Sequence, residues 1–268
     1  MKALNKTMIN PLFNLLANNN KLGYFAVKNE ESEIAKIYIY DVIVSDDYFG
    51  GISAKTIIKA INEINAPEIH LRIDSPGGDV FPAQSVAQHM RESSTRFVCH
   101  VDGMCASAAT YFAMAADDSV ISPGGLFMIH NSWTFAAGDH NELDKVSDVL
   151  QQIDGSMADI YAAKTGKDVE VLRQMMDRET NLIGSAAVDE GFIDRVAMDD
   201  GTQVPGNRIN WDMSAYGHNP PELSPSKAKN ESISEPDRCQ ADHAKVAAQE
   251  HNHRKRRLAL KKCQLITD

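Results

Sequence analysis

Hydrophobic and polar positions change between two periods along residues 33–196, and this change predicts strands that alternate with helices. Runs rich in β-branched and aromatic residues, typical of strands, occupy residues 33–44, 68–73, 96–101, 119–121, 126–129 and 192–196. Helical spacing of apolar residues, or a run of small residues, predicts helices at 54–65, 79–92, 106–115, 142–165, 168–176 and 185–190. Because strand–helix–strand units build parallel sheets, we expect an α/β domain with a mainly parallel sheet covered by helices.

The charge divides the chain into two unlike parts. The 268 residues carry a net charge of −10, but residues 1–200 hold 16 Lys and Arg against 29 Asp and Glu, whereas residues 201–268 hold 11 against 8. The acidic first part argues against a dedicated nucleic-acid binder, because binding of phosphate groups needs an excess of basic residues. No apolar run approaches the ~20 residues of a membrane helix, and the N-terminus is a poor signal peptide.

The composition also predicts where the folded part begins and ends. Five of the ten prolines fall between positions 205 and 236, which is typical of a linker or a disordered segment. The prediction is an N-terminal segment at 1–28, a folded domain at 29–200, a Pro- and Ser-rich linker at 201–240 and a basic, helical tail at 241–268. The tail is read either as a solvated helix or as an arm that docks on an acidic partner.

The first candidate site is the turn Ser75-Pro76-Gly77-Gly78, which lies between a predicted strand and a predicted helix. Two glycines allow the backbone to bend sharply and to approach a ligand closely. The free amides at the start of the following helix favour negative charge. The alternative is an ordinary tight turn, and the motif alone does not decide between the two.

The second candidate is the run Gly103-Met104-Cys105-Ala106-Ser107-Ala108-Ala109, where a strand gives way to a helix. A serine at such a turn can present its Oγ outward while neighbouring amides point at a developing oxyanion. The alternative is a buried helix of small residues with a merely structural serine. Cys105 is a rival nucleophile, although its apolar surroundings predict an inert buried thiol.

The third candidate is His130, in Met128-Ile129-His130-Asn131 at the end of a short predicted strand. A histidine there can accept a proton from a serine hydroxyl and return it to a leaving amine. A lone histidine is more often structural, but the other eight lie inside predicted strands, on or near helices or in the tail. His130 is therefore the best-placed general base.

Three motifs in this order resemble one known family. IDSPGG at 73–78, GMCASAA at 103–109 and MIH at 128–130 are similar to the Clp protease proteolytic subunit family. The segments IYIYDVI, IHLRIDSPGGDVF and MIHNSWTFAAGDHNEL look most like its phage branch, the head maturation (prohead) proteases. The resemblance covers about 30–200 and implies the ClpP/crotonase-like fold of βαβ superhelical repeats.

The resemblance also assigns roles to residues. It implies Ser107 as the nucleophile, His130 as the general base, and the amides of Gly78 and Ala108 as the oxyanion hole. The third member of the triad is expected shortly before Gly184–Asp194, which places it at Glu179, with Asp177 as the competing choice.

Two positions depart from the family. Glu179 stands where an Asp is usual. Asp74 stands where Asn is common, and its charge would weaken anion binding unless it points away from the amides.

The expected function is that of a serine endopeptidase that cleaves capsid, scaffold or portal proteins during prohead maturation, as a homo-oligomeric ring in the cytoplasm of a bacterial host. The closest rival is a housekeeping Clp-type subunit that works with an ATP-driven unfoldase. A crotonase-type acyl-CoA enzyme would need carboxylates near the glycine-turn amides in place of the Ser/His pair. A degenerate assembly factor would lack a triad member, and a Ser-Lys dyad would need a lysine in place of His130. Scattered cysteines fit a reducing compartment. No metal site, cofactor or membrane contact is predicted, and nucleic-acid binding stays open only for the tail.

Overall fold

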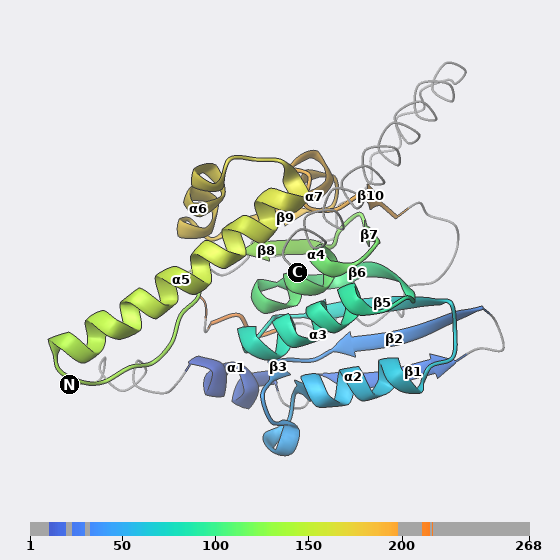
Figure 1. Cartoon of the computed structure of the whole chain (residues 1–268), viewed down its shortest axis with the longest axis horizontal. Helices are drawn as coiled ribbons and strands as arrows, with labels where there is room; N and C mark the ends of the chain where they lie inside the picture. The colour runs from blue at the N-terminus through green and yellow to red at the C-terminus, as the bar shows by residue number, and fades with distance from the viewer. Residues whose placement is uncertain (1–10, 20–22, 30–32, 198–210, 215, 217–268) are drawn as a thin grey trace, which may run out of the picture. The chain divides into compact units, whose positions relative to one another are not determined.

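The computed structural model describes residues 11–19, 23–29, 33–197, 211–214 and 216, and contacts divide the chain into units at 1–223 and 224–268. The second unit, which includes the basic tail predicted at 241–268, lies outside the described residues. Figure 1 shows the first unit as a twisted sheet with helices packed beside it. No helix in the described ranges is long and apolar enough to cross a membrane.

The main sheet of the described part runs in the order β1-β2-β5-β6-β7-β10, and most of its neighbours are parallel. The antiparallel exceptions are β1 beside β2 and β9 beside β8. The strands of this sheet are β1 (Tyr24–Asn29), β2 (Ile34–Tyr40), β5 (Glu68–Ser75), β6 (Arg96–Ala106), β7 (Asp118–Ile121), β8 (Leu126–Ile129), β9 (Thr180–Ile183) and β10 (Arg195–Val196). The mixed α/β fold with a mainly parallel sheet is confirmed.

Strand β6 is the branch point of the sheet. Its first half pairs with β7, from Val98 opposite Asp118, and its second half pairs with β8, from Met104 opposite Leu126. Gly103 lies between the two halves, where an added Cβ would come within 2.6 Å of the carboxylate of Asp74. The glycine therefore allows β5 and β6 to remain close where the sheet divides.

The helices bury apolar stripes against the sheet and against one another. Figure 1 shows α2 and α3 side by side over the strands, with α4 beside α3. Helix α5 is capped by a capping box at Asp139 and by left-handed Gly166, and only its C-terminal half is buried, through residues that include Met157 and Tyr161. The helices are α1 (Pro11–Asn19), α2 (Ala54–Glu63), α3 (Val80–Glu92), α4 (Thr110–Ala115), α5 (His140–Thr165), α6 (Val169–Asp177) and α7 (Ser185–Asp189).

Several predicted elements change at their ends. The strand predicted at 33–44 bends at Asp41 and becomes β2 and the short β3 (Ile43–Val44), which pairs with β4 (Ile52–Ser53). The strand predicted at 96–101 extends to Ala106, because its second half finds a new partner in β8. Helix α1 and strands β1 and β9 were not predicted, since their short apolar runs lack periodicity and gain stability from tertiary pairing. Two 3₁₀ turns complete the list, η1 (Asp47–Phe49) and η2 (Ser107–Ala109).

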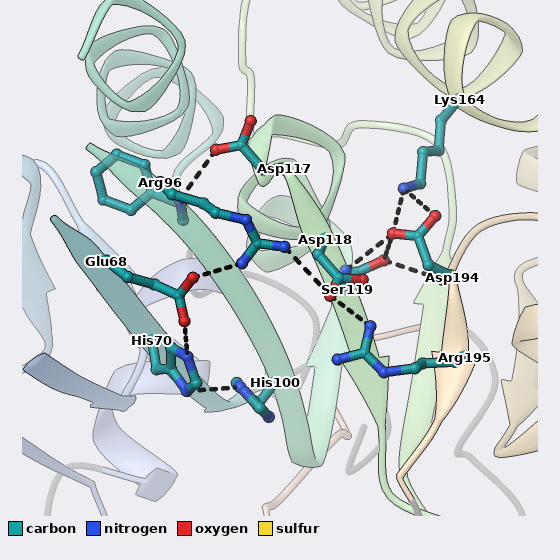
Figure 2. Close-up of polar contacts among 11 residues, drawn as sticks. Glu68, His70, Arg96, His100, Asp117, Asp118, Ser119, Lys164, Asp194 and Arg195 are labelled. Atoms are coloured by element: carbon teal, nitrogen blue, oxygen red, sulfur yellow. Dashed lines mark hydrogen bonds and ion pairs between the residues drawn. The ribbon is translucent and has the colours of Figure 1, made fainter. Parts of the chain in front are cut away.

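Polar side chains link neighbouring strands at the ends where β5, β6 and β7 begin, as Figure 2 shows. Arg96 binds Glu68 at 2.7 Å and Asp118 at 3.7 Å, and Arg195 also binds Asp118. These partly exposed pairs connect strands that are already hydrogen-bonded, so each adds modestly to stability.

Beside these ion pairs, the rings of His70 and His100 pack with centroids 4.7 Å apart, and burial lowers the pKa of His100 to about 3. A second group in Figure 2 links α5 to β7, because Asp194 accepts hydrogen bonds from Lys164 and Ser119. The second group does contain a serine, but Ser119 is fully buried and its hydroxyl donates to Asp194, so we assign both groups a structural role.

A second, smaller apolar core combines side chains from α1, β3, the C-terminal end of β6, β8 and the described residues after position 210. Trp211, Met213 and Tyr216 are buried there against side chains that include Leu15 and Met128. The linker prediction for 201–240 therefore does not describe these residues, because their large apolar side chains are buried against the folded domain. The remainder of that range lies outside the described residues.

Candidate active site

Ser107 and His130 meet at the edge where β6 and β8 end. The two strands run parallel with Ala106 opposite Met128, so both chains leave the sheet at the same side. The distance from His130 Nε2 to Ser107 Oγ is 2.6 Å, which is hydrogen-bonding distance. The structure thus brings together the serine and the histidine that sequence analysis singled out, from positions 23 residues apart.

Ser107 lies in a strained turn that presents its hydroxyl to the histidine. Its φ angle is +54°, in the left-handed region that non-glycine residues rarely adopt. The hydroxyl of Thr110 donates to the carbonyl of Ser107 at 2.6 Å and shares a further hydrogen bond with Tyr161 from α5. Alanines on both sides of the serine are fully buried, and their small side chains allow the strand-to-helix turn to pack tightly.

Burial keeps the imidazole of His130 neutral. Only 8% of His130 and 6% of Ser107 is exposed, and desolvation lowers the pKa of His130 to about 4. At neutral pH the imidazole is therefore uncharged, and in the tautomer that carries its proton on Nδ1 the Nε2 atom accepts the hydrogen bond of the serine hydroxyl. That protonation state is the one a general base needs.

The glycine turn lies directly beside the serine. A Cβ added to Gly77 would come within 2.8 Å of Ser107 Cβ and 3.1 Å of the amide nitrogen of Ala108. On its other side the turn pairs with β3, because the amide of Ile43 donates to the carbonyl of Gly77 and the amide of Asp79 donates to the carbonyl of Ile43. Across a trans peptide the N–H points opposite to the C=O, so the amide of Gly78 is directed away from β3. This geometry suits an anion-binding amide.

Asp74 points away from the glycine turn. Its carboxylate lies against Gly103 and accepts hydrogen bonds from the amide of Met104 at 3.0 Å and from the indole of Trp211 at 2.8 Å. These donors compensate part of the charge of Asp74, which reduces its effect on anion binding at Gly78. Asp74 is instead a buried anchor, and hydrogen bonds to a charged acceptor are among the stronger ones in proteins.

The register of β8 and β9 separates the two candidates for the third carboxylate. Ile129 opposite Thr180 is the last pair of the two strands, so His130 directly follows β8 and Glu179 directly precedes β9 at the same end of the ladder. Glu179 has a φ of +53°, which turns the chain at that point, and its charge contributes to raising the pKa of the nearby Tyr216. Asp177 is exposed and accepts a hydrogen bond at 2.7 Å from Asn131. The geometry favours Glu179.

Cys105 is an inert thiol, as the sequence predicted. It is fully buried, and desolvation raises the pKa of its thiol well above the ordinary value. A buried neutral thiol is a poor nucleophile, because the thiolate is the reactive form.

Sequence analysis missed one residue of the site, Tyr216. Its hydroxyl donates to the carbonyl of Pro76 at 2.5 Å, and its ring packs edge-on against His130 with centroids 5.0 Å apart. Burial raises the pKa of Tyr216, whereas a side-chain hydrogen bond with Ser107 opposes that rise. The signal in the sequence was weak: Trp211 and Tyr216 are bulky aromatics within a stretch otherwise typical of a linker.

Comparisons with known proteins identify the family of the chain. The family model described as Clp protease matches residues 34–200, which is more than half of the chain. The chain is 27% identical over 135 residues to an ATP-dependent Clp protease proteolytic subunit of Pleurastrum terricola, covering 50% of this chain and 69% of that protein. It is 26% identical over 155 residues to the protein of the same description from Ligilactobacillus salivarius (strain UCC118), covering 57% and 78%. The matched range contains the glycine turn, Ser107, His130 and Glu179, and the chain belongs to the Clp protease family, a family of peptidases.

Proposed function

We propose that this protein is a serine endopeptidase that works through an acyl-enzyme on Ser107. The observation that carries the proposal is the 2.6 Å contact between Ser107 Oγ and a neutral His130, beside a glycine turn whose amide at Gly78 is directed away from β3. Glu179, one step beyond the last pair of β8 and β9, completes the triad. Gly78 and Ala108 supply the oxyanion amides.

The reaction follows from these positions. Ser107 Oγ attacks the carbonyl carbon of a peptide while His130 Nε2 takes the hydroxyl proton, and the amides of Gly78 and Ala108 hold the oxyanion. The imidazolium then gives its proton to the leaving amine, which breaks the C–N bond. A water molecule, deprotonated by His130, hydrolyses the resulting ester. The carboxylate of Glu179 stabilises the imidazolium in both steps.

The proposed substrates are capsid, scaffold or portal proteins of a phage, cleaved by a homo-oligomeric ring in the host cytoplasm. The support is the likeness of the segments around 37–43, 69–81 and 128–143 to prohead proteases. A processing enzyme of this kind leaves a few defined products.

The test compares purified wild type with Ser107→Ala on candidate capsid and scaffold proteins, followed by mass spectrometry. Cleavage sites and fluorophosphonate labelling are expected with wild type and absent with Ser107→Ala. Ser85→Ala, which removes an exposed hydroxyl on α3, is the matched control and should label as wild type does. Labelling that persists in Ser107→Ala would disprove the proposal.

A second candidate is a degradative Clp subunit, favoured by the two relatives described as ATP-dependent Clp protease proteolytic subunits. It predicts that adding an ATP-driven unfoldase with ATP converts a folded substrate into short peptides. A processing protease would instead produce the same few fragments with or without the unfoldase.

A further inference from the structure

Residues 211–214 and 216, which we name the strap, lie beside the active site and are anchored at two places. At one end the indole of Trp211 donates to the buried carboxylate of Asp74. Beside it, the backbone of Asp212 donates to the side chain of Asn19 at 2.8 Å and accepts from it at 3.2 Å. Asn19 belongs to α1 and is fully buried. These hydrogen bonds therefore attach the strap to α1, 193 residues earlier in the chain.

At its other end the strap inserts Tyr216 beside the nucleophile. The phenol hydroxyl donates a hydrogen bond to the carbonyl of Pro76, which lies in the same turn as Gly78. The ring packs edge-on against His130 and lies 6.3 Å, centroid to centroid, from Trp133, which follows β8. Tyr216 therefore fills the space bounded by the glycine turn, the serine and the histidine.

A peptide substrate needs that same space. Its scissile carbonyl must contact Ser107 Oγ with its oxygen toward the glycine turn, and the flanking residues must lie along the edges of the turn and of β8. With the strap in place the serine is 6% exposed, and the Pro76 carbonyl already has a donor. Substrate and strap cannot occupy the site together.

We infer that the strap occupies the substrate site and inhibits the enzyme until it is displaced. The site would then accept an aromatic side chain of the substrate where it now holds Tyr216. This inference rests on the proposed function. Only molecules in which the strap has lifted can be acylated, so the observed rate equals the intrinsic rate multiplied by the open fraction. The opposite role, in which Tyr216 assists catalysis by positioning His130, predicts that its removal slows the reaction.

The experiment measures the rate of fluorophosphonate labelling of full-length wild type, Tyr216→Ala and Trp211→Ala. Full burial of an aromatic side chain favours the closed over the open state of the strap by about tenfold to a hundredfold. Both variants should therefore label at least about tenfold faster than wild type. Tyr48→Ala, which removes a tyrosine that is 82% exposed, is the matched control and should label at the wild-type rate. Equal or slower labelling in folded Tyr216→Ala would overturn the inference.

Two further measurements keep the test decisive. Tyr216→Phe keeps the ring and loses only the hydrogen bond to Pro76, so it should label a few-fold faster even if the alanine variant fails to fold; a rate at or below that of wild type contradicts the strap. A peptide with the sequence of residues 211–216, added to Tyr216→Ala, should slow its labelling again.

Failure of the two proposals can be told apart. Labelling that depends on Ser107 but is not accelerated by strap variants removes the strap and leaves the protease. Absence of Ser107-dependent labelling in every folded variant removes both.

Discussion

Two kinds of segment meet at Ser107, and they are built by different means. The turns that end β5 and β6 depend on unusual backbone: φ is +54° at Ser107, +91° at Gly77 and +142° at Gly78. The strap depends on bulk and on side-chain hydrogen bonds, through Trp211 and Tyr216. The residues of the proposed chemistry are constrained by local backbone geometry, whereas the residues of the strap are constrained by the volume they fill and by the hydrogen bonds of their side chains.

Because of this difference, substitutions in the two segments should change the reaction rate in opposite directions. Changes in the turns or in the triad remove transition-state stabilisation and should lower the rate even when the strap is open. Changes in the strap should raise the rate by releasing the site. Each turn variant is therefore best measured in the Tyr216→Ala background, where the strap no longer contributes, because Tyr216 contacts the turn and the effects of contacting residues do not add.

The largest effect after loss of Ser107 is expected for Glu179→Gln. A neutral amide cannot stabilise the imidazolium and favours the wrong tautomer, so kcat/KM for a peptide reporter should fall by about 10³–10⁴-fold. Asp177→Asn is the matched control, because that carboxylate is exposed and binds Asn131 rather than the base. Full activity in Glu179→Gln with loss of activity in Asp177→Asn would exchange the two assignments.

Gly78→Ala should follow, with a loss of about 10²–10³-fold that corresponds to one oxyanion donor. A Cβ at this position would lie 2.0 Å from the carbonyl oxygen of Ile43, so the turn must move and take its amide with it. Gly155→Ala in α5 is the control: its Cβ meets only the end of the Arg173 side chain, and it should keep full activity. Unchanged kcat/KM in Gly78→Ala would show that this amide does not hold the oxyanion.

The sequence was sufficient to predict the sheet and the two main site residues, for a physical reason. The stretches that form β5, β6 and β8 have strand patterns, and parallel strands end at one edge of a sheet, which puts Ser107 and His130 at the same edge. Their pairing as nucleophile and base was implied by the resemblance to the Clp protease family. The glycines and the alanines around the serine marked the turns because few other residues fit there.

The rest could not be predicted, because it depends on partners distant in sequence. Strand β9 is a short, half-polar run that becomes a strand only beside β8. The strap has the composition of a linker, and it is held in place by partners such as the carboxylate of Asp74, which binds Trp211 from 137 residues away. The sequence likewise could not show that Asp74 binds the amide of Met104 and the indole of Trp211, because both donors are distant in sequence.

The pH dependence distinguishes the covered site from the released one. With the strap in place the pKa of His130 is lowered to about 4 by burial, so the wild type keeps its base unprotonated down to that pH. Removing Tyr216 hydrates the imidazole and should return its pKa toward the ordinary ~6.5. From pH 7.5 to pH 5, kcat/KM of Tyr216→Ala should then fall by about 30-fold, while that of wild type changes little. Coincident acid limbs in the two proteins would show that Tyr216 does not bury the base.

The smallest effect is expected at the far anchor of the strap, in Asn19→Ala. This change removes the paired hydrogen bonds between Asn19 and the backbone of Asp212, but leaves Trp211 and Tyr216 in place. A net loss of about 1 kcal/mol from the closed state corresponds to about fivefold faster labelling of Ser107. Asn62→Ala on the exposed face of α2 is the control and should label at the wild-type rate. Because Asn19 touches neither the serine nor the histidine, faster labelling in Asn19→Ala reports release of the strap alone, and slower labelling would mean that the strap supports the site rather than covering it.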